Sequence, residues 1–525
     1  MRDLCPARRD LSSLAHRCLA LRGVLRCASP GRSPMSPADG RVTKTFPVFD
    51  CDAHINDPYE IWTTYVAPEH RDLVRTAYWK DERQALLNGR TPTIGGGHYE
   101  FPSYNPICIA GPQMSKQVMR KLQQTPLTAE QKRYLEHPGA YDPKARLKEM
   151  DLMGIDQVMI IPTMFVMNYP FIENVDAAYA LARAYNDWAK DFCSAAPDRL
   201  FPAGWLPLQN VPYTCQELER IAGMDFRVAL VRPIDARGKY PNYIFPSVTG
   251  GAPTSTMDRV FRTFEETGIV LGMHTFPANN PEIGRGMFLA TPPVNATSPG
   301  ELIVRTGGAL GGGGAEAGGR MVDSQTLSFV YEAVVWLAQV LLAGMLDLYP
   351  RLRMAIFESN ASWLPQLLEH WDRLFKLYAN ERPLQSDRLP SEAFAQQCFI
   401  AFESDERPVF RQWDRFADVG VWSSDAYHHD GADSWSAIRE MVAAGTPETV
   451  QAKLLGENAR RMYGIEGKLF VTEEPLPLER PAWFPGGEEL QHWAEVESNP
   501  RAHGVTKFDL GRLDPRLLMQ ALRPY

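Results

Sequence analysis

The 525-residue sequence contains no uninterrupted apolar run of about 18 residues, which is the length that a transmembrane helix requires. It also lacks an excess of positive charge, because the formal net charge is −8. Both absences argue against a membrane or a nucleic acid as a partner. The eight cysteines include no C-x-x-C pair, so neither a disulfide framework nor a zinc ribbon is expected, and a cytoplasmic location is the simplest interpretation.

The first 41 residues differ in composition from the rest of the chain, because they contain eight arginines against three aspartates. Apolar residues recur at helical spacing between the arginines, at Leu11, Leu14, Cys18, Leu21 and Leu25. This pattern is typical of an amphipathic transit peptide. The alternative is a reading frame that starts too early, with Met35 as the true start. Under either interpretation, residues 1–41 are expected to be an unstructured extension outside the folded unit.

From residue 46 onward, short apolar runs alternate with longer stretches of helical periodicity. The apolar runs are predicted to be strands at 46–52, 157–162, 201–208, 228–232, 269–274, 353–358, 398–403 and 420–424. Helices are predicted between them at 144–153, 176–195, 213–223, 255–267, 325–348 and 362–380. A closed parallel sheet satisfies this alternation most simply, so we predict an α/β fold, a (β/α)8 (TIM) barrel, over residues 42–465.

Two stretches are too long to be simple connections of such a barrel. Residues 59–143 follow the first strand, and residues 276–325 follow the fifth, so both are predicted to be insertions at the C-terminal face. Long loops at that face commonly form lids or substrate pockets. The glycine run at 307–319 lacks the G-x-x-x-x-G-K-[ST] pattern of a phosphate loop and is expected to be a lid segment. Residues 466–525 are Pro-rich and acidic and are predicted to be a tail packed on the barrel.

Polar residues follow the C-terminal ends of several predicted strands. Asp52 and His54 are two residues apart, a spacing that points both side chains to one face of a strand. His274 ends the fifth strand, and Asp425 follows the eighth. Imidazole and carboxylate ligands together suit Zn²⁺, Mn²⁺ or Fe²⁺ and argue against a thiolate site. The alternative is that the D-x-H pair only forms a surface salt bridge or caps a strand.

Two further residues at the same face are candidates for contact with a substrate. Arg232 follows the fourth strand, and its planar guanidinium suits a carboxylate or a phosphate, although it can equally pair with a carboxylate of the barrel. His428 follows Asp425 and can either donate a hydrogen bond to the substrate or support a neighbouring metal ligand.

The order of these motifs resembles the amidohydrolase superfamily, and in particular the amidohydrolase-2 group that includes aminocarboxymuconate-semialdehyde decarboxylase. The matching segments span roughly residues 46–464 and include VFDCDAHINDP, RLKEMDLMGIDQVMIIPT, MHTF, RMAIFESNASWLPQLLE, CFIAFESDE, VWSSDAYHHDG and KLLGENARRMYGI. The resemblance implies a distorted (β/α)8 barrel. It also implies metal ligands at Asp52, His54, His274 and Asp425, and gives Asp425 the handling of the catalytic proton.

The sequence departs from the pattern of that group at two strands. The first strand reads D-x-H where many relatives carry H-x-H or E-x-H, and the histidine expected at the sixth strand is replaced by FESN. Glu358 and Asn360 in this segment offer oxygen ligands that can complete a second metal position. One or two divalent metal ions (Zn, Fe or Mn) per chain are therefore expected. The alternative is that Glu358 only pairs with Arg232.

The expected activity is metal-dependent hydrolysis of an ester, a thioester (an acyl-CoA among the candidates) or an amide. Asp425 acts as general base on a metal-activated water, and the metal, with Arg232 or His428, holds the oxyanion. The alternative is non-oxidative decarboxylation of an aromatic or unsaturated carboxylic acid, which the missing histidine disfavours. A third interpretation is a binding protein on a barrel that has lost catalysis. The insertions favour a bulky organic acid derivative as substrate, and self-association as a homodimer stays open.

Overall fold

The computed structural model describes residues 40–78, 128–231, 258–275 and 326–492, apart from short gaps within these ranges. The gaps are residues 56, 59, 132–137, 164–168, 170–171, 173, 327–328, 383–385, 387, 429–430, 477–478, 480, 485, 487 and 489–491. Arg232, the second predicted insertion, nearly all of the N-terminal extension and most of the first insertion lie outside the described residues. No described helix is long and apolar enough to cross a membrane.

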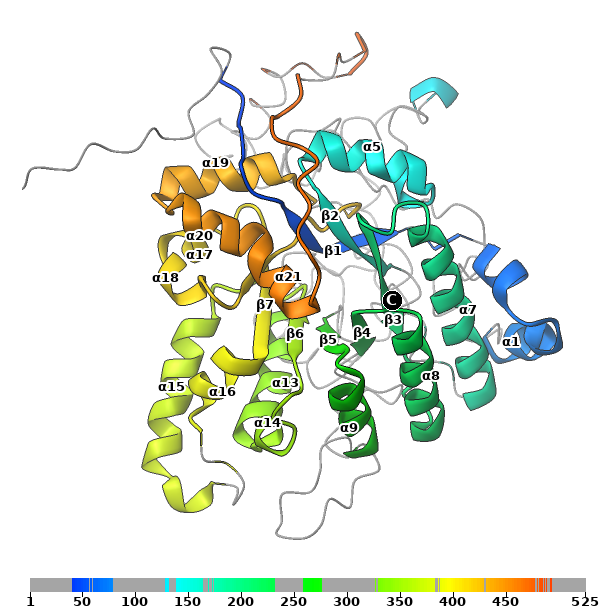
Figure 1. Ribbon diagram of the computed structural model, residues 1–525, viewed down its shortest axis with the longest axis vertical. Helices are drawn as coiled ribbons and strands as arrows, with labels where there is room; N and C mark the ends of the chain where they lie inside the picture. Colours follow the sequence, from blue (N-terminus) through cyan, green and yellow to red (C-terminus); the bar gives the residue numbers. More distant parts are fainter. Residues whose placement is uncertain are drawn as a thin grey trace, which may run out of the picture.

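Eight parallel strands form one sheet, in which each strand pairs with its neighbours in chain order. The strands are β1 (Phe49–Ile55), β2 (Gln157–Pro162), β3 (Leu200–Trp205), β4 (Val228–Val231), β5 (Val270–His274), β6 (Met354–Phe357), β7 (Cys398–Phe402) and β8 (Gly420–Trp422). Helices surround the sheet (Figure 1). The predicted distorted (β/α)8 barrel is therefore confirmed.

The first strand lies three residues further along the chain than the sequence predicted. The sequence predicts that the strand ends at Asp52, but β1 continues through His54 to Ile55 and is buried throughout. Its pairing with β2 is irregular between Asp50 and Ala53. The strand continues because its polar side chains face other polar groups inside the barrel rather than solvent, so a change from apolar to polar residues does not mark its end.

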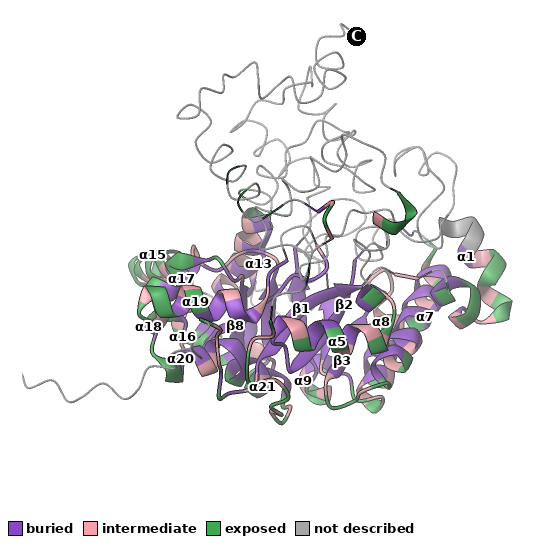
Figure 2. Cartoon of the chain, turned by 90° about the horizontal axis from the view of Figure 1, so that it is seen from above, coloured by how far each residue is buried: buried purple, intermediate pink, exposed green. Residues whose placement is uncertain are grey.

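The helices between the strands place apolar faces against the sheet and exposed faces outward (Figure 2). Those that follow the predicted pattern are α5 (Pro143–Met153), α7 (Val175–Cys193), α8 (Val211–Gly223), α9 (Asp258–Thr267) and α15 (Leu364–Leu377). Asparagine side chains cap the starts of two of them: Asn174 accepts from the backbone amides of Asp176 and Ala177, and Asn210 accepts from that of Tyr213.

One predicted helix is wrong as a continuous element. Within residues 325–348, the described residues form α13 (Val330–Leu342) and α14 (Met345–Leu348), separated at Gly344, which adopts a left-handed conformation with φ of 64°. Glycine is the residue that enters this region without steric penalty, so the helical periodicity continues across a break in the backbone.

The remaining helices are short. Near the start of the barrel lie η1 (Ile61–Tyr65), η2 (Pro68–His70), α1 (Arg71–Tyr78) and η3 (Pro138–Ala140). Later ones are η6 (Ala379–Glu381), α16 (Pro390–Gln397), α17 (Arg407–Arg411), α18 (Trp413–Phe416), α19 (Ser434–Ala444), α20 (Glu448–Ala452), η7 (Lys453–Glu457) and α21 (Asn458–Tyr463).

Backbone hydrogen bonds close the barrel between its first and last strands. The amide of Asp425 donates to the carbonyl of Asp52 at 3.1 Å, and the amide of His54 donates to the carbonyl of Ala426. Ser424 adds a second connection, because its amide and hydroxyl donate to the Asp50 carboxylate at 3.0 and 2.5 Å. The segments that follow β8 and form β1 are therefore held directly against each other.

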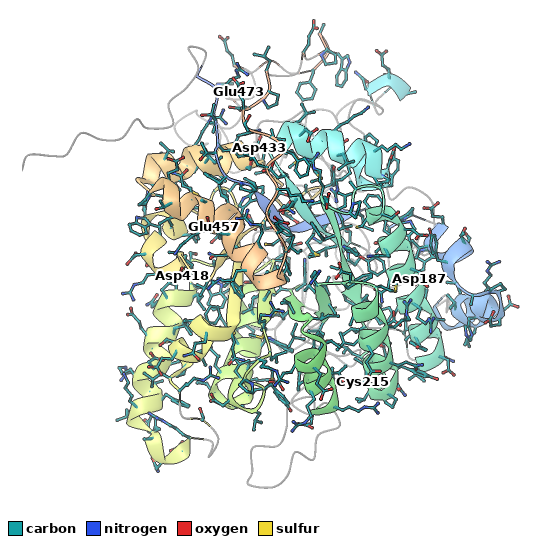
Figure 3. All side chains as sticks on the ribbon, viewed as in Figure 1. Asp187, Cys215, Asp418, Asp433, Glu457 and Glu473 are labelled. Atoms are coloured by element: carbon teal, nitrogen blue, oxygen red, sulfur yellow. The ribbon has the colours of Figure 1, made fainter. Side chains whose placement is uncertain are left out.

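The start of the C-terminal tail runs beside the segment that leads into β1 (Figure 1). Thr43 and Glu473 form an antiparallel bridge, and Glu473 lies at the top of the view in Figure 3. Asp156, at the N-terminal end of β2, fixes the tail from inside, since its carboxylate accepts from the amides of Phe470 and Val471 at 2.6 and 2.8 Å. The same carboxylate forms an ion pair with the buried Lys44.

Candidate metal centre

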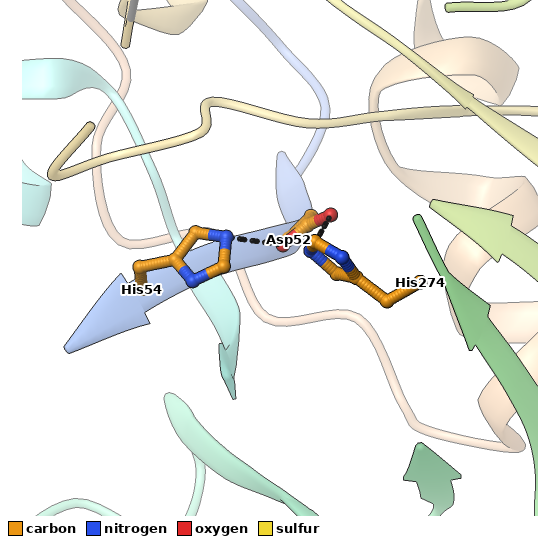
Figure 4. Close-up of side chains that lie close together, drawn as sticks. All are labelled: Asp52, His54 and His274. Carbon is orange, nitrogen blue, oxygen red and sulfur yellow. Dashed lines mark ion pairs between the residues drawn. The ribbon is translucent and has the colours of Figure 1, made fainter. Parts of the chain in front are cut away.

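β1 supplies two polar side chains to the interior of the barrel. Asp52 and His54 are both buried, and Nε2 of His54 lies 3.2 Å from Oδ1 of Asp52. His274, the last residue of β5, approaches from the opposite wall, with its Nε2 at 3.4 Å from Oδ2 of Asp52 (Figure 4). One ligand atom from each of these three side chains lies within 4.8 Å of the others.

The ring orientation of each histidine leaves Nε2 facing the cluster. Nδ1 of His54 is 3.2 Å from the carbonyl oxygen of Pro162, and Nδ1 of His274 is 2.7 Å from that of Thr275. A carbonyl can only accept, so Nδ1 carries the proton in both rings and Nε2 presents a lone pair. This arrangement is the usual support for a histidine that binds a metal through Nε2.

Asp425 and His428 add to the cluster from the segment after β8. Oδ1 of Asp425 lies 3.4 Å from Nε2 of His54 and 2.8 Å from Nδ1 of His428. Asp425 has a φ of 47°, an unusual value for a residue other than glycine, and such values often occur at functional sites. His54, Asp425 and His428 form a second group of three whose ligand atoms lie within 4.8 Å of one another.

The charges of this cluster suit a divalent cation. Burial alone raises the pKa of the Asp52 carboxyl, but the positive charge that His274 and His54 carry when they are protonated outweighs burial and holds that pKa below its ordinary value. Burial lowers the pKa of His54, against the effect of Asp52. An ionised carboxylate beside a neutral imidazole is the state in which these groups bind a metal.

Buried polar atoms in the cluster provide an independent test of the fit. Within the part of the chain that the structure describes, neither the carboxylate oxygens of Asp52 nor Nε2 of His54 has a hydrogen-bond partner in good geometry. Buried polar groups without partners are rare, and a bound ion is one accepted explanation. Nitrogen and oxygen donors of this kind fit Zn²⁺, Mn²⁺ or Fe²⁺.

Two further predicted oxygen ligands, Glu358 and Asn360, follow β6. Glu358 is in neither described group of metal-ligand atoms. The amide of Asn360 instead donates to Oε1 of Glu403 at 3.3 Å and to Oε1 of Glu406 at 3.4 Å. The predicted second metal position therefore gains no support among the described residues. Arg232 lies outside them.

Two residues for which the sequence predicts no specific role contact this cluster. Asp50 is in the same motif as Asp52, and its carboxylate accepts a hydrogen bond from the hydroxyl of Ser424. Burial raises the pKa of the Asp50 carboxyl to about 7. Thr163, directly after β2, has its hydroxyl 3.4 Å from Nε2 of His428. The polar position after β2 was the one available sequence signal for Thr163, since strand ends meet at the barrel mouth.

The sequence profile of the amidohydrolase family matches residues 49–465, and the chain therefore belongs to that family. This confirms the resemblance drawn from the strand-end motifs. No curated protein matches the chain significantly.

Solved structures with the same fold include an amidohydrolase from Mycobacterium avium subsp. paratuberculosis K-10. It is 17% identical, with a TM-score of 0.54, over 80% of this chain and 100% of that one. Another is a 5-carboxyvanillate decarboxylase from Novosphingobium aromaticivorans in complex with manganese and 4-hydroxy-3-methoxy-5-nitrobenzoic acid. It is 15% identical, with a TM-score of 0.50, over 80% of this chain and 96% of that one. At these identities the likeness establishes the fold alone.

Proposed function

We propose that this protein is a metal-dependent decarboxylase that removes the carboxylate of an aromatic or unsaturated acid without oxidation. The observation that carries the proposal is the contact between Asp425 and His428, at 2.8 Å, beside the buried group of Asp52, His54 and His274. A site of this kind holds a cation and a proton-handling pair at one point of the barrel mouth. The ligands of the Novosphingobium structure, manganese and a nitrobenzoic acid, are consistent with this choice.

The residues that would hold the metal are Asp52, His54, His274 and Asp425. A divalent cation held there supplies positive charge that binds the substrate carboxylate and stabilises negative charge developing on the substrate. The amino-acid ligands alone favour no single metal, and Mn²⁺, Zn²⁺ and Fe²⁺ all accept this mixture of imidazole and carboxylate.

Asp425 and His428 would manage the proton. In the reaction, a proton adds to the carbon that bears the carboxylate, the C–C bond breaks, and its electron pair stays with that carbon as CO₂ leaves. Oδ1 of Asp425 is the atom that hands over this proton, and Nδ1 of His428, in contact with it, returns a proton from solvent. His428 is suited to this exchange because its side chain is 23% exposed whereas that of Asp425 is 2% exposed.

The end of β6 favours hydrolysis as a second candidate function. The segment after this strand carries Glu358 and Asn360 rather than the histidine expected in decarboxylase relatives. In hydrolysis of an ester, thioester or amide, Asp425 would accept a proton from water instead of donating one to carbon. The two functions therefore use the same pair of residues and differ in the direction of the first proton transfer.

A single experiment separates the two functions. Enzyme loaded with Mn²⁺ is incubated in D₂O with a panel of hydroxylated aromatic acids labelled with ¹³C at the carboxylate, and with the methyl esters and coenzyme A thioesters of the same acids. Decarboxylation releases ¹³CO₂ and places one deuterium on the carbon that lost it. Release of methanol or free thiol without labelled CO₂ would establish hydrolysis and overturn the decarboxylase proposal.

A further inference from the structure

A buried group of three side chains lies behind the candidate metal centre, between α5 and the segment after β8. We name Arg146, Glu149 and Tyr427 the Arg146 unit. All three are buried, and Arg146, at 2% exposure, is among the largest fully enclosed side chains of the described residues. A buried arginine is costly to desolvate unless its contacts compensate, so its partners indicate what it does.

Arg146 contacts both segments that form the metal centre. Its guanidinium donates to the carbonyl of His54 at 2.7 Å. The same group lies over the ring of Tyr427, 4.5 Å from Cζ to the ring centroid. The planar guanidinium can stack on an aromatic ring and donate from its edge at the same time, which a lysine ammonium cannot do.

The tyrosine is fixed in turn by α5. Its hydroxyl donates to the carboxylate of Glu149, one turn after Arg146 on the same helix. The other carboxylate oxygen of Glu149 accepts from the backbone amide of Gly139 at 3.2 Å. A Cβ at position 139 would overlap the Glu149 carboxylate and the Tyr427 hydroxyl, so glycine permits this close approach. Asp142 caps the start of α5, which gives the unit a rigid base.

The position of Tyr427 in the chain links the Arg146 unit to the metal centre. Tyr427 lies between Ala426, whose carbonyl accepts from the amide of His54, and His428, whose ring contacts Asp425. His54 is therefore held at its amide by the segment after β8 and at its carbonyl by Arg146. We propose that the Arg146 unit positions His54 against Asp425 and thereby sets the affinity of the centre for its divalent cation. This inference rests on the proposed metal centre, but not on the reaction that occurs there.

The test measures binding of Mn²⁺ alone, by equilibrium dialysis against a metal-buffered solution and without substrate. Tyr427→Phe keeps the ring under the guanidinium and removes the hydroxyl that reaches Glu149. Partners of metal ligands are commonly worth 10- to 100-fold in affinity, so we expect the Kd for Mn²⁺ to rise by about tenfold. Arg146→Met should raise it further, and Arg146→Lys, which retains a donor for the carbonyl of His54, should recover part of the loss.

The matched control is Tyr169→Phe. Tyr169 is as buried as Tyr427, and its hydroxyl donates to the carbonyl of Ala178 in α7 at 2.6 Å. This variant loses one buried hydrogen bond of a tyrosine and should lower Tm about as much as Tyr427→Phe, with the Kd for Mn²⁺ unchanged. Affinities within about twofold of wild type in all the Arg146-unit variants, with Tm lowered as in the control, would show that the unit only stabilises the fold.

The outcome is independent of the decarboxylase proposal. Wild-type protein that binds Mn²⁺ but releases no CO₂ from any substrate would overturn the reaction and leave the positioning role to be judged by the variants. Unchanged affinity in the variants of an active decarboxylase would overturn the positioning role alone.

Discussion

The imidazole of His428 lies against that of His54, with ring centroids 3.8 Å apart and planes inclined by 23°. Their nitrogen atoms contact the same carboxylate oxygen, Oδ1 of Asp425. One ring belongs to the proposed metal ligands, and the other has access to solvent at the edge of the cluster. The stacking therefore keeps the proposed metal ligand and the proposed proton carrier in a fixed relation to one carboxylate.

Loss of His274 should remove the metal. His274→Ala takes away the one imidazole that reaches Asp52 from β5, and we expect a loss of at least about tenfold in affinity, since even indirect partners of a ligand contribute that much. Metal content after dialysis, measured by plasma mass spectrometry, checks this. His370→Ala, at an exposed position of α15, is the control. Equal metal content in both variants would place the cation elsewhere.

Replacement of Asp425 should abolish turnover. Asp425→Asn keeps the shape of the side chain but removes the proton carrier, and kcat should fall by about 10²-fold or more. Measuring bound Mn²⁺ in the same preparation separates two causes. Retained metal with lost turnover indicates proton transfer, and loss of both indicates a ligand role. Turnover close to that of wild type would contradict any mechanism that depends on this carboxylate.

Glu406 should make the protein less stable as the pH rises. Burial raises the pKa of its carboxyl to about 7, although backbone amides of Ala361 and Glu403 favour its charged form. The unfolded chain ionises near the ordinary value of 4.5, so between pH 4.5 and 7 the folded state binds more protons and loses stability as the pH increases. The free energy of unfolding should fall by about 3 kcal/mol over this range, at about 1.4 kcal/mol per pKa unit.

Urea unfolding at several pH values between 5 and 8 tests this loss. The free energy of unfolding should fall less in Glu406→Gln than in wild type. Glu440→Gln serves as control, because the pKa of Glu440 is lowered by its hydrogen bond to Arg407 and this group stays ionised in both states over that range. Parallel profiles for wild type and Glu406→Gln would show that the buried carboxyl is not protonated in the folded state.

Asp156 should contribute strongly to stability. Asp156→Ala leaves the buried Lys44 without its carboxylate and frees the amides of Phe470 and Val471, so we expect a loss of about 3–5 kcal/mol. Asp418→Ala, on the left side of the view in Figure 3, removes the exposed ion pair with Lys453 and should cost at most about 1 kcal/mol. Chemical denaturation of the two variants gives both values, and similar losses would contradict the assigned role.

The periodicity of the sequence was sufficient to predict the barrel, because buried parallel strands and amphipathic helices leave strong local patterns. The start and end of β1 and the break at Gly344 were not predicted correctly. Both depend on what surrounds a residue in space: Asp52 continues a strand because it meets His274, and Gly344 interrupts a helix through a backbone conformation that apolar spacing does not reveal.

The residues of the candidate site were likewise predicted only in part. Strand-end positions were enough to suggest Asp52, His54, His274 and Asp425, because parallel strands end at one face of a barrel. Asn360 was predicted as a metal ligand on the same grounds, but its amide donates to Glu403 and Glu406, which follow the next strand. The contact of Arg146 with His54 lacked a sequence signal altogether, because a charged residue on a helix is ordinarily expected at the surface.

The closure of the barrel also has a consequence for how the protein is made. Asp52 and His54 leave the ribosome early, whereas Asp425 and His428 follow only after β8, and hydrogen bonds join β1 to the segment that follows β8. A nascent chain therefore carries an incomplete set of the proposed metal ligands until almost the whole barrel has been synthesised. If the proposed centre binds the cation, full-affinity capture is thus a late event of biosynthesis, and bound metal would report that the first strand has met the segment after the last.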